Sequence, residues 1–569
     1  MAPVDCGDGV RLERGLTCRM SDGVRLVSDH YYPPGEGPFP TLLMRQPYGR
    51  DIASTVVYAH PVWFARQGYH VAIQDVRGRG DSEGDFYPFR NERKDGAETI
   101  AWLHSHPLCN GRIGMYGFSY QGLTQLLAAA EQPQGLVCIA PGMTACDLYR
   151  GWFYRNGVLR LSSALGWGIQ MLREDARRRG LKPASDALEA AWSDLRAQAN
   201  FVPYGEHPAI NDAGLPEYVR DWLAHGQPGE YWEGLDVSRD IEKIAVPALH
   251  VSGWFDTYLN GSVDGFLALS QGAATEFARR HQYLIAGPWI HIPWGELIGG
   301  QNLGGEALLD TDELLLRWFN HWMKDAGEFA DEPRIRHFAL GENRWCSAEG
   351  WPEQTTLELF LRSRGKANSR KGDGVLAASP AQSDEPRDVF VYDPEVPVFA
   401  PGGPMALSGP QDQAEAELGN NVLVYTGEPL REKLHILGHP RIALYAATSA
   451  GSADFTAKLV RLLPDGRAQF VCMGVARSSY LFAGKSYQAD AVQCWEFDLD
   501  PTSCVFFPGE RARLEIASSA FPLYDRNPST AIPASKASHW NWARSTQQIL
   551  HTAACPSALY LPVIAESAR

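Results

Sequence analysis

Short apolar segments that could form buried strands alternate with segments of helical spacing between residues 40 and 140. Residues 40–46 (PTLLMRQ) and 69–76 (YHVAIQDV) are apolar runs of the kind that buried strands have, and residues 54–67 between them have helical spacing. Alternation of this kind indicates a mainly parallel sheet that is covered by helices. The pattern continues with a helix at 91–104, a strand at 112–118, a helix at 120–130 and a strand at 135–140.

The pattern then changes, in a chain whose 569 residues exceed the size at which one hydrophobic core stops growing. Strand candidates vanish after about residue 143 and helix formers dominate, which predicts a helical insertion. The alternation of strands and helices resumes near residue 245. Its segments are a strand at 246–252, a helix at 260–271, a strand at 282–286 and a helix at 311–324.

After about residue 333 the chain turns to short, alternating segments that are rich in β-branched residues and separated by turn residues. Examples are residues 356–361, 457–463 and 512–516. Many short strands joined by turns predict a β-sandwich or jelly roll. The expected organisation is an α/β core at 1–142 and 245–332, a helical cap at 143–244 and a C-terminal β domain at 333–569.

Composition limits the partners and the compartment. With 52 Lys and Arg against 67 Asp and Glu, the formal charge is −15, which disfavours nucleic acid or an anionic membrane as the main partner. No segment approaches the roughly 18 apolar residues of a membrane-spanning helix, and the N-terminus lacks the pattern of an export signal. The ten cysteines include no C-x-x-C pair. We therefore expect a cytoplasmic protein with reduced thiols.

The sequence from Gly117 to Gly122 (GFSYQG) lies where an apolar strand meets a helix. This is the context of a nucleophile elbow, a sharp turn that lifts a serine hydroxyl above the edge of the sheet. Gln121 stands where the usual G-x-S-x-G pattern has its second glycine. On the motif alone, Ser119 could equally be a helix-capping residue in a Gly-rich turn.

Two further residues support the elbow. In α/β-hydrolases the acid and the base follow the serine in chain order, each after a later strand. Asp256 and His291 lie just past the strands expected at 246–252 and 282–286, where open α/β sheets place their sites. Other residues of the same types are available, but none follows a strand as closely. The alternatives are Asp240 or Asp264 for the acid and His250 or His281 for the base.

The chemistry requires these residue types. A serine hydroxyl is a weak nucleophile until a base takes its proton, and neutral imidazole does this near pH 7. A carboxylate orients the imidazole and stabilises its charged form. The developing oxyanion needs hydrogen-bond donors: the backbone N–H of Tyr120 is one candidate, and the hydroxyl of Tyr48, in the loop after the first strand, is another. From physics alone, the interpretation of Tyr48 as a packed loop residue is favoured.

The motifs resemble those of the cocaine esterase and X-prolyl dipeptidyl-peptidase family of α/β-hydrolases. They are GFSYQG, PYGR, DVRGRGDSEG, GWFD and GPWIH, followed in the C-terminal half by SADFTAKLVRLLPDG and SSAFPLYDRNP. The resemblance implies an α/β-hydrolase core, an inserted helical cap and a C-terminal jelly roll. It also implies a triad of Ser119, Asp256 and His291, with Tyr48 and the Tyr120 amide as oxyanion donors, and makes a homodimer plausible.

The substrate pocket is less constrained than the triad. By resemblance, the cap residues Trp152 and Trp167 line an acyl pocket, with Phe255 and Tyr258 beside the acid; alternatively, these aromatic residues fill the cap core. The family includes α-amino-acid ester hydrolases, which hold a substrate ammonium with a cluster of carboxylates. Glu296, Glu306 and Asp310 are candidates for such a cluster.

The resulting hypothesis is a serine hydrolase that cleaves small-molecule carboxylic esters through an acyl-enzyme. The alternatives are an amidase or acylase, an α-amino-acid ester hydrolase, an X-prolyl dipeptidyl peptidase, transfer to an acceptor other than water, and a jelly-roll binding or scaffolding protein with a vestigial core. No metal or cofactor is expected, because His104 and His106 are too few for a zinc site. The tripeptide Arg79-Gly80-Asp81 lies in a family loop and is interpreted as structural.

Overall fold

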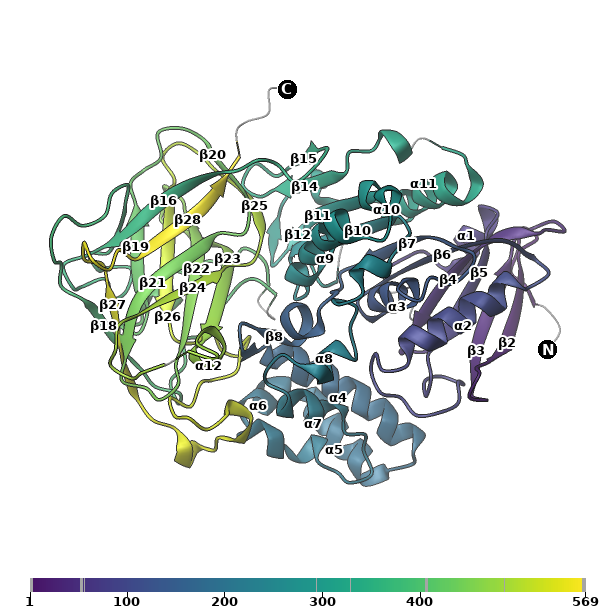
Figure 1. Cartoon of the computed structure of the whole chain (residues 1–569), viewed down its shortest axis with the longest axis horizontal. Coiled ribbons are helices and arrows are strands. Elements are labelled where there is room, and N and C mark those ends of the chain that lie inside the picture. The colour runs from purple at the N-terminus through teal and green to yellow at the C-terminus, as the bar shows by residue number, and fades with distance from the viewer. Residues whose placement is uncertain are drawn as a thin grey trace.

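The chain folds into three parts that pack against one another (Figure 1). The computed structural model describes residues 4–564 apart from 52–54, 56, 293, 328, 405–407 and 486. The N-terminal core, the helical cap and the C-terminal β domain appear in purple to teal, blue, and green to yellow (Figure 1). The predicted α/β-hydrolase architecture with a cap and a β-rich C-terminal domain is confirmed.

The core is an eleven-stranded sheet in the order β1-β2-β3-β5-β4-β6-β7-β10-β11-β14-β15. All neighbours from β5 to β14 run parallel, and antiparallel strands extend the sheet at both edges. The strands are β1 (Val4–Asp5), β2 (Arg11–Arg19), β3 (Arg25–Tyr32), β4 (Phe39–Gln46), β5 (His70–Asp75), β6 (Cys109–Phe118), β7 (Leu136–Gly142), β10 (Ala248–Phe255), β11 (Gln282–Ile290), β14 (Ile335–Ala339) and β15 (Arg344–Ala348).

Helices cover this sheet, as the alternating pattern predicts. They are α1 (Pro61–Arg66), α2 (Glu92–His104), α3 (Tyr120–Ala129), α9 (Leu259–Gly272), α10 (Glu276–Arg280) and α11 (Thr311–Lys324). The helix expected at 54–67 is shorter than predicted, because Pro61 occupies its first turn and the His60 ring accepts a hydrogen bond from the Val62 amide. Part of the expected range, residues 52–54 and 56, lies outside the described residues.

The core extends further along the chain than the expected boundary at residue 333. Strand β14 pairs in parallel with β11, and β15 pairs with β14, so both complete the core sheet. The first strand of the β domain is β16, which begins at Thr355. A short β-branched segment does not by itself reveal which sheet it joins.

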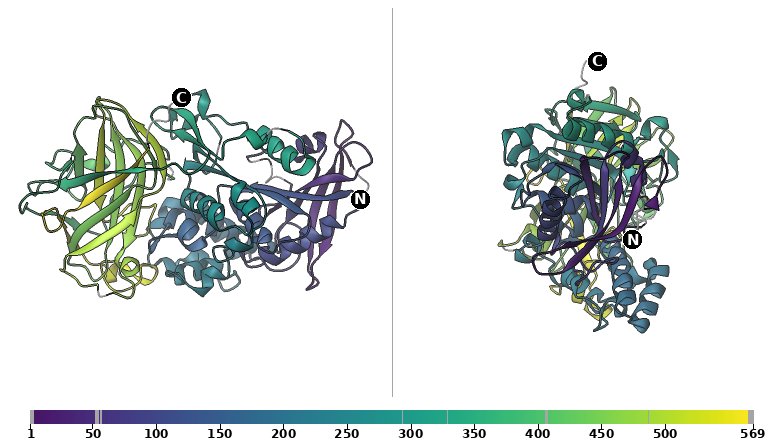
Figure 2. Two further views of the ribbon diagram at one scale, coloured as in Figure 1. Left: turned by 45° about the horizontal axis from the view of Figure 1, so that its top comes forward. Right: turned by 90° about the vertical axis from the view of Figure 1, so that its right-hand side faces the viewer.

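Along the chain, the cap follows β7 and precedes β10, and it is helical, as expected. Its helices are the blue ribbons in Figure 2. Its helices are α4 (Leu161–Arg178), α5 (Lys182–Ser193), α6 (Leu195–Asn200), α7 (Tyr218–Ala224) and α8 (Glu230–Glu233). A small hairpin of β8 (Tyr154–Arg155) and β9 (Val158–Leu159) precedes them. No helix in the described part of the chain is both long and apolar enough to span a membrane.

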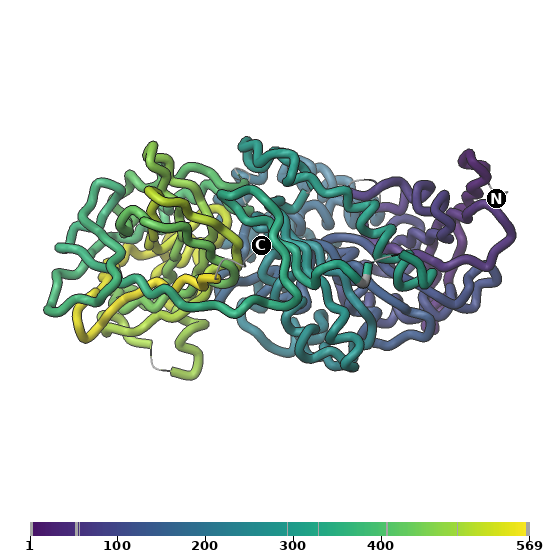
Figure 3. The backbone as a smooth tube through the Cα atoms, turned by 90° about the horizontal axis from the view of Figure 1, so that it is seen from above, coloured from purple at the N-terminus to yellow at the C-terminus, as the bar shows by residue number. Residues whose placement is uncertain are grey.

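Among its described residues, the β domain contains thirteen strands that form one hydrogen-bonded network. Seen from above, it forms one end of the elongated molecule (Figure 3). The strands are β16 (Thr355–Arg362), β17 (Val375–Ala377), β18 (Asp388–Tyr392), β19 (Leu423–Gly427), β20 (Leu434–Gly438), β21 (Arg441–Thr448), β22 (Asp454–Leu462), β23 (Ala468–Arg477), β24 (Gln493–Asp498), β25 (Thr502–Phe506), β26 (Arg511–Ala517), β27 (Ser545–Leu550) and β28 (Ala558–Val563).

A buried ion-pair cluster joins the β domain to the cap. Arg477 contacts the carboxylates of Asp454 and Asp525 at 2.8 and 3.0 Å. Asp525 in turn accepts a hydrogen bond from the Leu159 amide, and the Arg477 amide donates to Asn156. Because a buried charge is costly unless it is paired, this cluster fixes the cap hairpin against the β domain.

Two buried histidines in the core are expected to make the fold sensitive to acid. His30 and His70 are hydrogen-bonded to each other at 2.8 Å and fully buried. Burial, with a smaller contribution from His106, lowers the pKa of His30 from 6.5 to about 3, and burial lowers the pKa of His70 as well. The unfolded chain therefore binds more protons, so this contribution to stability is lost as the pH falls below about 6.5 towards 3.

The measurement is the melting temperature of wild type, His30→Asn and the control His539→Asn, an exposed position, between pH 7 and pH 4. We expect the melting temperature of wild type and of the control to fall more steeply with decreasing pH than that of His30→Asn. Equal slopes in all three proteins would contradict the prediction.

Candidate active site

Ser119 stands at the turn between β6 and α3 in a conformation that few serines adopt. Its φ is 59° and its ψ is −126°, a region that costs energy for a residue with a Cβ atom. Its hydroxyl makes no capping hydrogen bond to the helix. The interpretation of Ser119 as a simple capping residue is therefore not supported, and the strained turn is the geometry of a nucleophile elbow.

The packing of the turn explains why glutamine stands at position 121, where the usual motif has glycine, and why glycine follows at position 122. The Gln121 side chain folds back, and its Oε1 accepts a hydrogen bond from the Phe118 amide at 3.2 Å. There is no room for a side chain at Gly122, because a Cβ atom there would lie 2.8 Å from Thr144 Cβ and 2.9 Å from Gly142 O. Gly122 thus supplies the close packing between helix and strand.

Replacing Gly122 by Ala is expected to lower stability by about 1–3 kcal/mol, because the added methyl overlaps backbone and a β-branched side chain. Thermal unfolding measures the effect. Gly305→Ala is the matched control, since a Cβ atom there meets nothing within 4 Å. Equal melting temperatures for the two variants would contradict the packing argument.

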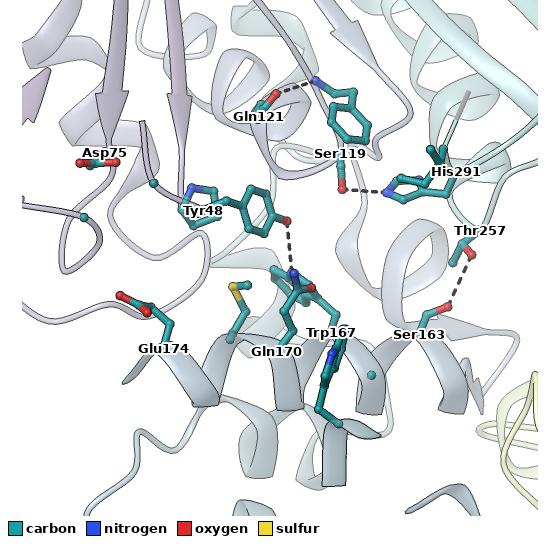
Figure 4. Close-up of a pocket in the computed structure, with 18 of the residues that line it drawn as sticks. Tyr48, Asp75, Ser119, Gln121, Ser163, Trp167, Gln170, Glu174, Thr257 and His291 are labelled. Atoms are coloured by element: carbon teal, nitrogen blue, oxygen red, sulfur yellow. Dashed lines mark hydrogen bonds between the residues drawn. The ribbon is translucent and has the colours of Figure 1, made fainter. Parts of the chain in front are cut away.

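His291 connects Ser119 to Asp256 through two hydrogen bonds. Its Nε2 lies 3.1 Å from Ser119 Oγ, and its Nδ1 lies 2.7 Å from Asp256 Oδ1 (Figure 4). Asp256 and His291 directly follow β10 and β11. The alternative candidates have other partners: Asp240 pairs with Arg93, Asp264 lies near His439, and His250 and His281 contact Gln282 and Phe277.

The surroundings of Asp256 select one imidazole tautomer. The carboxylate is fully buried, and its Oδ2 has no hydrogen-bond partner among the described residues. An ionised carboxylate only accepts hydrogen bonds, so His291 Nδ1 must carry the proton that reaches Oδ1. In the neutral ring Nε2 is then the acceptor, which is the state that can take the proton of Ser119.

Tyr48 follows β4 and lies on the side of Ser119 opposite to His291 (Figure 4). Its hydroxyl accepts a hydrogen bond from Trp167 Nε1 at 3.3 Å. Burial raises the pKa of Tyr48 to about 12, against smaller opposite contributions from hydrogen bonds with Trp167 and Ser119. The phenol therefore keeps its proton at neutral pH and is able to donate it in a hydrogen bond.

Tyr120 is the first residue of α3, so its amide lies outside the helical hydrogen-bond pattern. Its buried side chain anchors the turn, because the phenol donates to Glu92 Oε1 at 2.8 Å and accepts from the Phe89 amide. Glu92 is paired in turn with the buried Arg45 at 2.7 Å. This network holds the amide next to Ser119 in place.

Tyr48, Ser119 and His291 line a cavity of about 810 Å³ between core and cap. Its cap wall is one face of α4, with Ser163, Trp167, Gln170, Glu174 and Arg177 spaced three or four residues apart (Figure 4). Sequence reasoning missed the polar members of this face, although their helical spacing from Trp167 was visible.

The four aromatic residues proposed for the pocket divide into two groups. Trp167 and Tyr258 line the cavity, whereas Trp152 and Phe255 are not among its lining residues. Trp152 stacks on Tyr258 with ring centroids 3.9 Å apart. Phe255 is fully buried and packs towards the β domain, where its ring centroid lies 6.3 Å from that of Phe470. The structure therefore places Trp152 and Phe255 behind the wall.

Glu296, Glu306 and Asp310 do not form a carboxylate cluster at the cavity. None of the three is among its lining residues, and Asp310 caps α11 by accepting from the Glu313 amide. The carboxylates that line the cavity are Asp51, Asp75, Asp81 and Glu174. In the part of the chain that is described, no group of three or more His, Cys, Asp or Glu is placed to hold a metal ion.

The loop at residues 75–84 supports the cavity wall. Arg79 is fully buried, pairs with Asp175 of the cap at 3.0 Å and stacks on Phe86. A Cβ atom at Gly80, whose φ is +51°, would lie 1.9 Å from Asp75 Oδ2. Arg79 and Gly80 of the Arg79-Gly80-Asp81 tripeptide are thus built into the fold, as a structural interpretation requires.

Comparison with known proteins identifies relatives along nearly the whole chain. Residues 22–293 match the X-Pro dipeptidyl-peptidase (S15) family, and residues 327–560 match the X-Pro dipeptidyl-peptidase C-terminal non-catalytic domain. Cocaine esterase from a Rhodococcus species is 32% identical over 96% of this chain and 97% of its own length.

Solved structures share the fold. An α-amino acid ester hydrolase superposes with a TM-score of 0.79 over 99% of this chain and 98% of its own, at 24% identity. An aminopeptidase from a marine-sediment Thaumarchaeota archaeon superposes with a TM-score of 0.82 over 97% of each chain, also at 24% identity. At this identity the likeness extends to the architecture of all three parts and not to substrate.

Proposed function

The chain belongs to the X-Pro dipeptidyl-peptidase (S15) family and is a serine hydrolase, and on that premise we propose that it cleaves carboxylic esters through an acyl-enzyme formed on Ser119. The observation that carries the proposal is the continuous hydrogen-bonded chain from Ser119 through His291 to Asp256 at the cavity. A nucleophile, a base and an orienting acid within hydrogen-bond reach constitute the machinery of acyl transfer.

In the first half-reaction, Ser119 Oγ attacks the ester carbonyl carbon while His291 Nε2 takes the hydroxyl proton. The carbonyl oxygen becomes an oxyanion, which accepts hydrogen bonds from the Tyr48 hydroxyl and the Tyr120 amide. When the tetrahedral intermediate collapses, the carbon–oxygen bond to the alcohol breaks. His291 returns the proton to the departing alkoxide, which leaves as the alcohol.

In the second half-reaction, a water molecule takes the place of the alcohol. His291 removes a proton from the water as its oxygen attacks the acyl carbon, and the same two donors hold the second oxyanion. Collapse releases the carboxylic acid, and the proton on His291 returns to Ser119. The buried Asp256 holds the Nδ1 hydrogen bond and stabilises the imidazolium in both steps.

The cavity favours an ester over an amino-terminal peptide substrate. Peptidases and amino-ester hydrolases need a carboxylate for the substrate ammonium, and each of the lining carboxylates already contacts an arginine. Asp75 and Asp81 both contact Arg50, Glu174 contacts Arg177, and Asp51 contacts Arg14. Aromatic and apolar side chains near Ser119 instead suit an uncharged acyl group. Such side chains are Phe118, Trp167, Tyr258 and Ile292.

The experiment that tests the proposal combines turnover with chemical trapping. Nitrophenyl, benzoyl and aminoacyl esters and matched anilides are offered to the enzyme, and initial rates are compared. A fluorophosphonate probe is then reacted with the enzyme, and the labelled peptide is identified by mass spectrometry. We expect faster hydrolysis of neutral esters than of aminoacyl esters or anilides, and a label on Ser119.

The outcomes separate the alternatives. Preference for aminoacyl esters would favour an α-amino-acid ester hydrolase, and preference for anilides would favour an amidase or peptidase. Labelling of another residue would overturn the assignment of Ser119. Absence of both turnover and labelling would favour a binding protein with a vestigial core.

A further inference from the structure

We propose that Trp167 is a positioning residue of the oxyanion hole, whose indole N–H directs the proton of the Tyr48 hydroxyl towards Ser119. The inference rests on the proposed function and deepens it, because it assigns the cap a part in the chemical step. Trp167 was expected to act only as a wall of the acyl pocket.

The direction of the hydrogen bond follows from the groups involved. The distance from Trp167 Nε1 to the Tyr48 hydroxyl oxygen is 3.3 Å (Figure 4). An indole nitrogen is a donor only, so the Tyr48 oxygen must accept. The phenol has a single proton, which remains available for another acceptor, and Ser119 lies on the side of the Tyr48 hydroxyl away from Trp167 (Figure 4). The proton is thereby aimed at the side of Tyr48 where the substrate oxygen arrives.

This arrangement has two effects on an oxyanion donor. First, the phenol keeps its orientation before substrate arrives, so less reorganisation is needed when negative charge develops. Second, a hydroxyl that accepts a hydrogen bond becomes a better donor, because successive hydrogen bonds polarise one another. Without the indole N–H, the Tyr48 hydroxyl would lose both its orientation and this polarisation.

The indole itself is held rigidly by aromatic residues of both the cap and the core. Trp167 stacks on Trp222 with centroids 5.2 Å apart and an interplanar angle of 5°. Its other ring neighbours include Trp152 at 5.7 Å, Phe89 at 5.8 Å and Tyr120 at 6.2 Å. Because these aromatic contacts leave the ring little freedom, the position of α4 sets the position of the N–H group.

It follows that core and cap build the oxyanion hole together. The core supplies Tyr48 and the Tyr120 amide, and the cap supplies the group that orients Tyr48. Substitutions that shift α4 would then change kcat as well as substrate preference, whereas a cap that only selects substrates would mainly change KM.

The test is a double-mutant cycle between positions 48 and 167. Tyr48→Phe is expected to lower kcat about 10²–10³-fold, as does the loss of an oxyanion donor elsewhere. Trp167→Phe keeps an aromatic ring but removes the N–H, and we expect it to lower kcat about tenfold with a smaller change in KM. In the Tyr48→Phe background the same substitution should have almost no further effect.

Two additions keep the test decisive. Trp232→Phe is the matched control, because this cap tryptophan also donates to an oxygen, the His225 carbonyl, but does not line the cavity; its kcat should equal that of wild type. Replacing residue 167 by β-(3-benzothienyl)alanine exchanges only the N–H for sulfur, so it preserves the packing if Trp167→Phe fails to fold. Fluorophosphonate titration counts the functional sites in every variant.

The results distinguish this inference from the proposed function. The positioning role would be overturned if Trp167→Phe lowered kcat equally in the wild-type and Tyr48→Phe backgrounds, or if neither substitution at 167 lowered kcat. Labelling at Ser119 would still support the hydrolase in both cases. Failure of wild type to label would instead count against the proposed function itself. The rate of fluorophosphonate labelling provides the same cycle without knowledge of the natural ester.

Discussion

Ser119→Ala, His291→Ala and the variant that carries both substitutions are each expected to lower kcat by about 10⁶-fold. The reason is the shared proton: His291 Nε2 lies 3.1 Å from Ser119 Oγ, so the nucleophile and the base work as one unit. Without the imidazole, Ser119 keeps its proton, and without Ser119, His291 has no nucleophile to activate. The double variant should therefore be no slower than either single variant.

Initial rates with the preferred ester, normalised to protein that retains the wild-type melting temperature, measure this effect. His281→Ala is a suitable control, because its ring contacts the Phe277 carbonyl and not Ser119. If the losses in the two single variants multiplied in the double variant, the two residues would act independently and the proposed unit would be wrong.

The positions of the site residues could be predicted because they depend on local sequence. Ser119, Asp256 and His291 each directly follow an apolar strand, and the carboxyl ends of parallel strands meet at one edge of a sheet. A strand's end can be found from its apolar run and the residues that bound it. The order of the three residues along the chain then suffices to bring them together.

The walls of the cavity could not be predicted in the same way, because the direction of a side chain is decided by packing. Trp167 and Trp152 are both tryptophans of the cap segment that were expected to line the pocket. In the structure, Trp167 faces Tyr48, whereas Trp152 stacks behind Tyr258. The same limit applies to β14, whose sheet is determined by its pairing with β11 and not by its own residues. Non-local contacts decide both outcomes.

Core and cap are linked at more than one place around the cavity. Arg79 reaches from the core loop to Asp175 on α4, and its Cζ lies 3.7 Å from the centroid of the Phe86 ring. Trp167, on the same helix, contacts Tyr48. A pair of buried charges is costly to separate, so the Arg79–Asp175 pair holds α4 at a fixed distance from the core and with it the indole that orients Tyr48.

Asp256→Asn is expected to lower kcat by about 10⁴-fold without unfolding the protein, because the amide has the shape of the carboxylate. The loss comes from the tautomer of His291. Asp256 Oδ1 accepts the Nδ1 proton at 2.7 Å, and Oδ2 has no other partner among the described residues that could fix the orientation of an amide.

An asparagine at 256 is free to turn its NH₂ group towards Nδ1, which then accepts and leaves the ring proton on Nε2. A protonated Nε2 cannot take the proton of Ser119, so attack stops although all three side chains remain in place. Asp264, the alternative acid, lies near His439 and not near His291, so Asp264→Asn should retain wild-type kcat. A larger loss in Asp264→Asn than in Asp256→Asn would reverse the assignment of the acid, whereas unchanged rates in both would show that the imidazole needs no orienting carboxylate here.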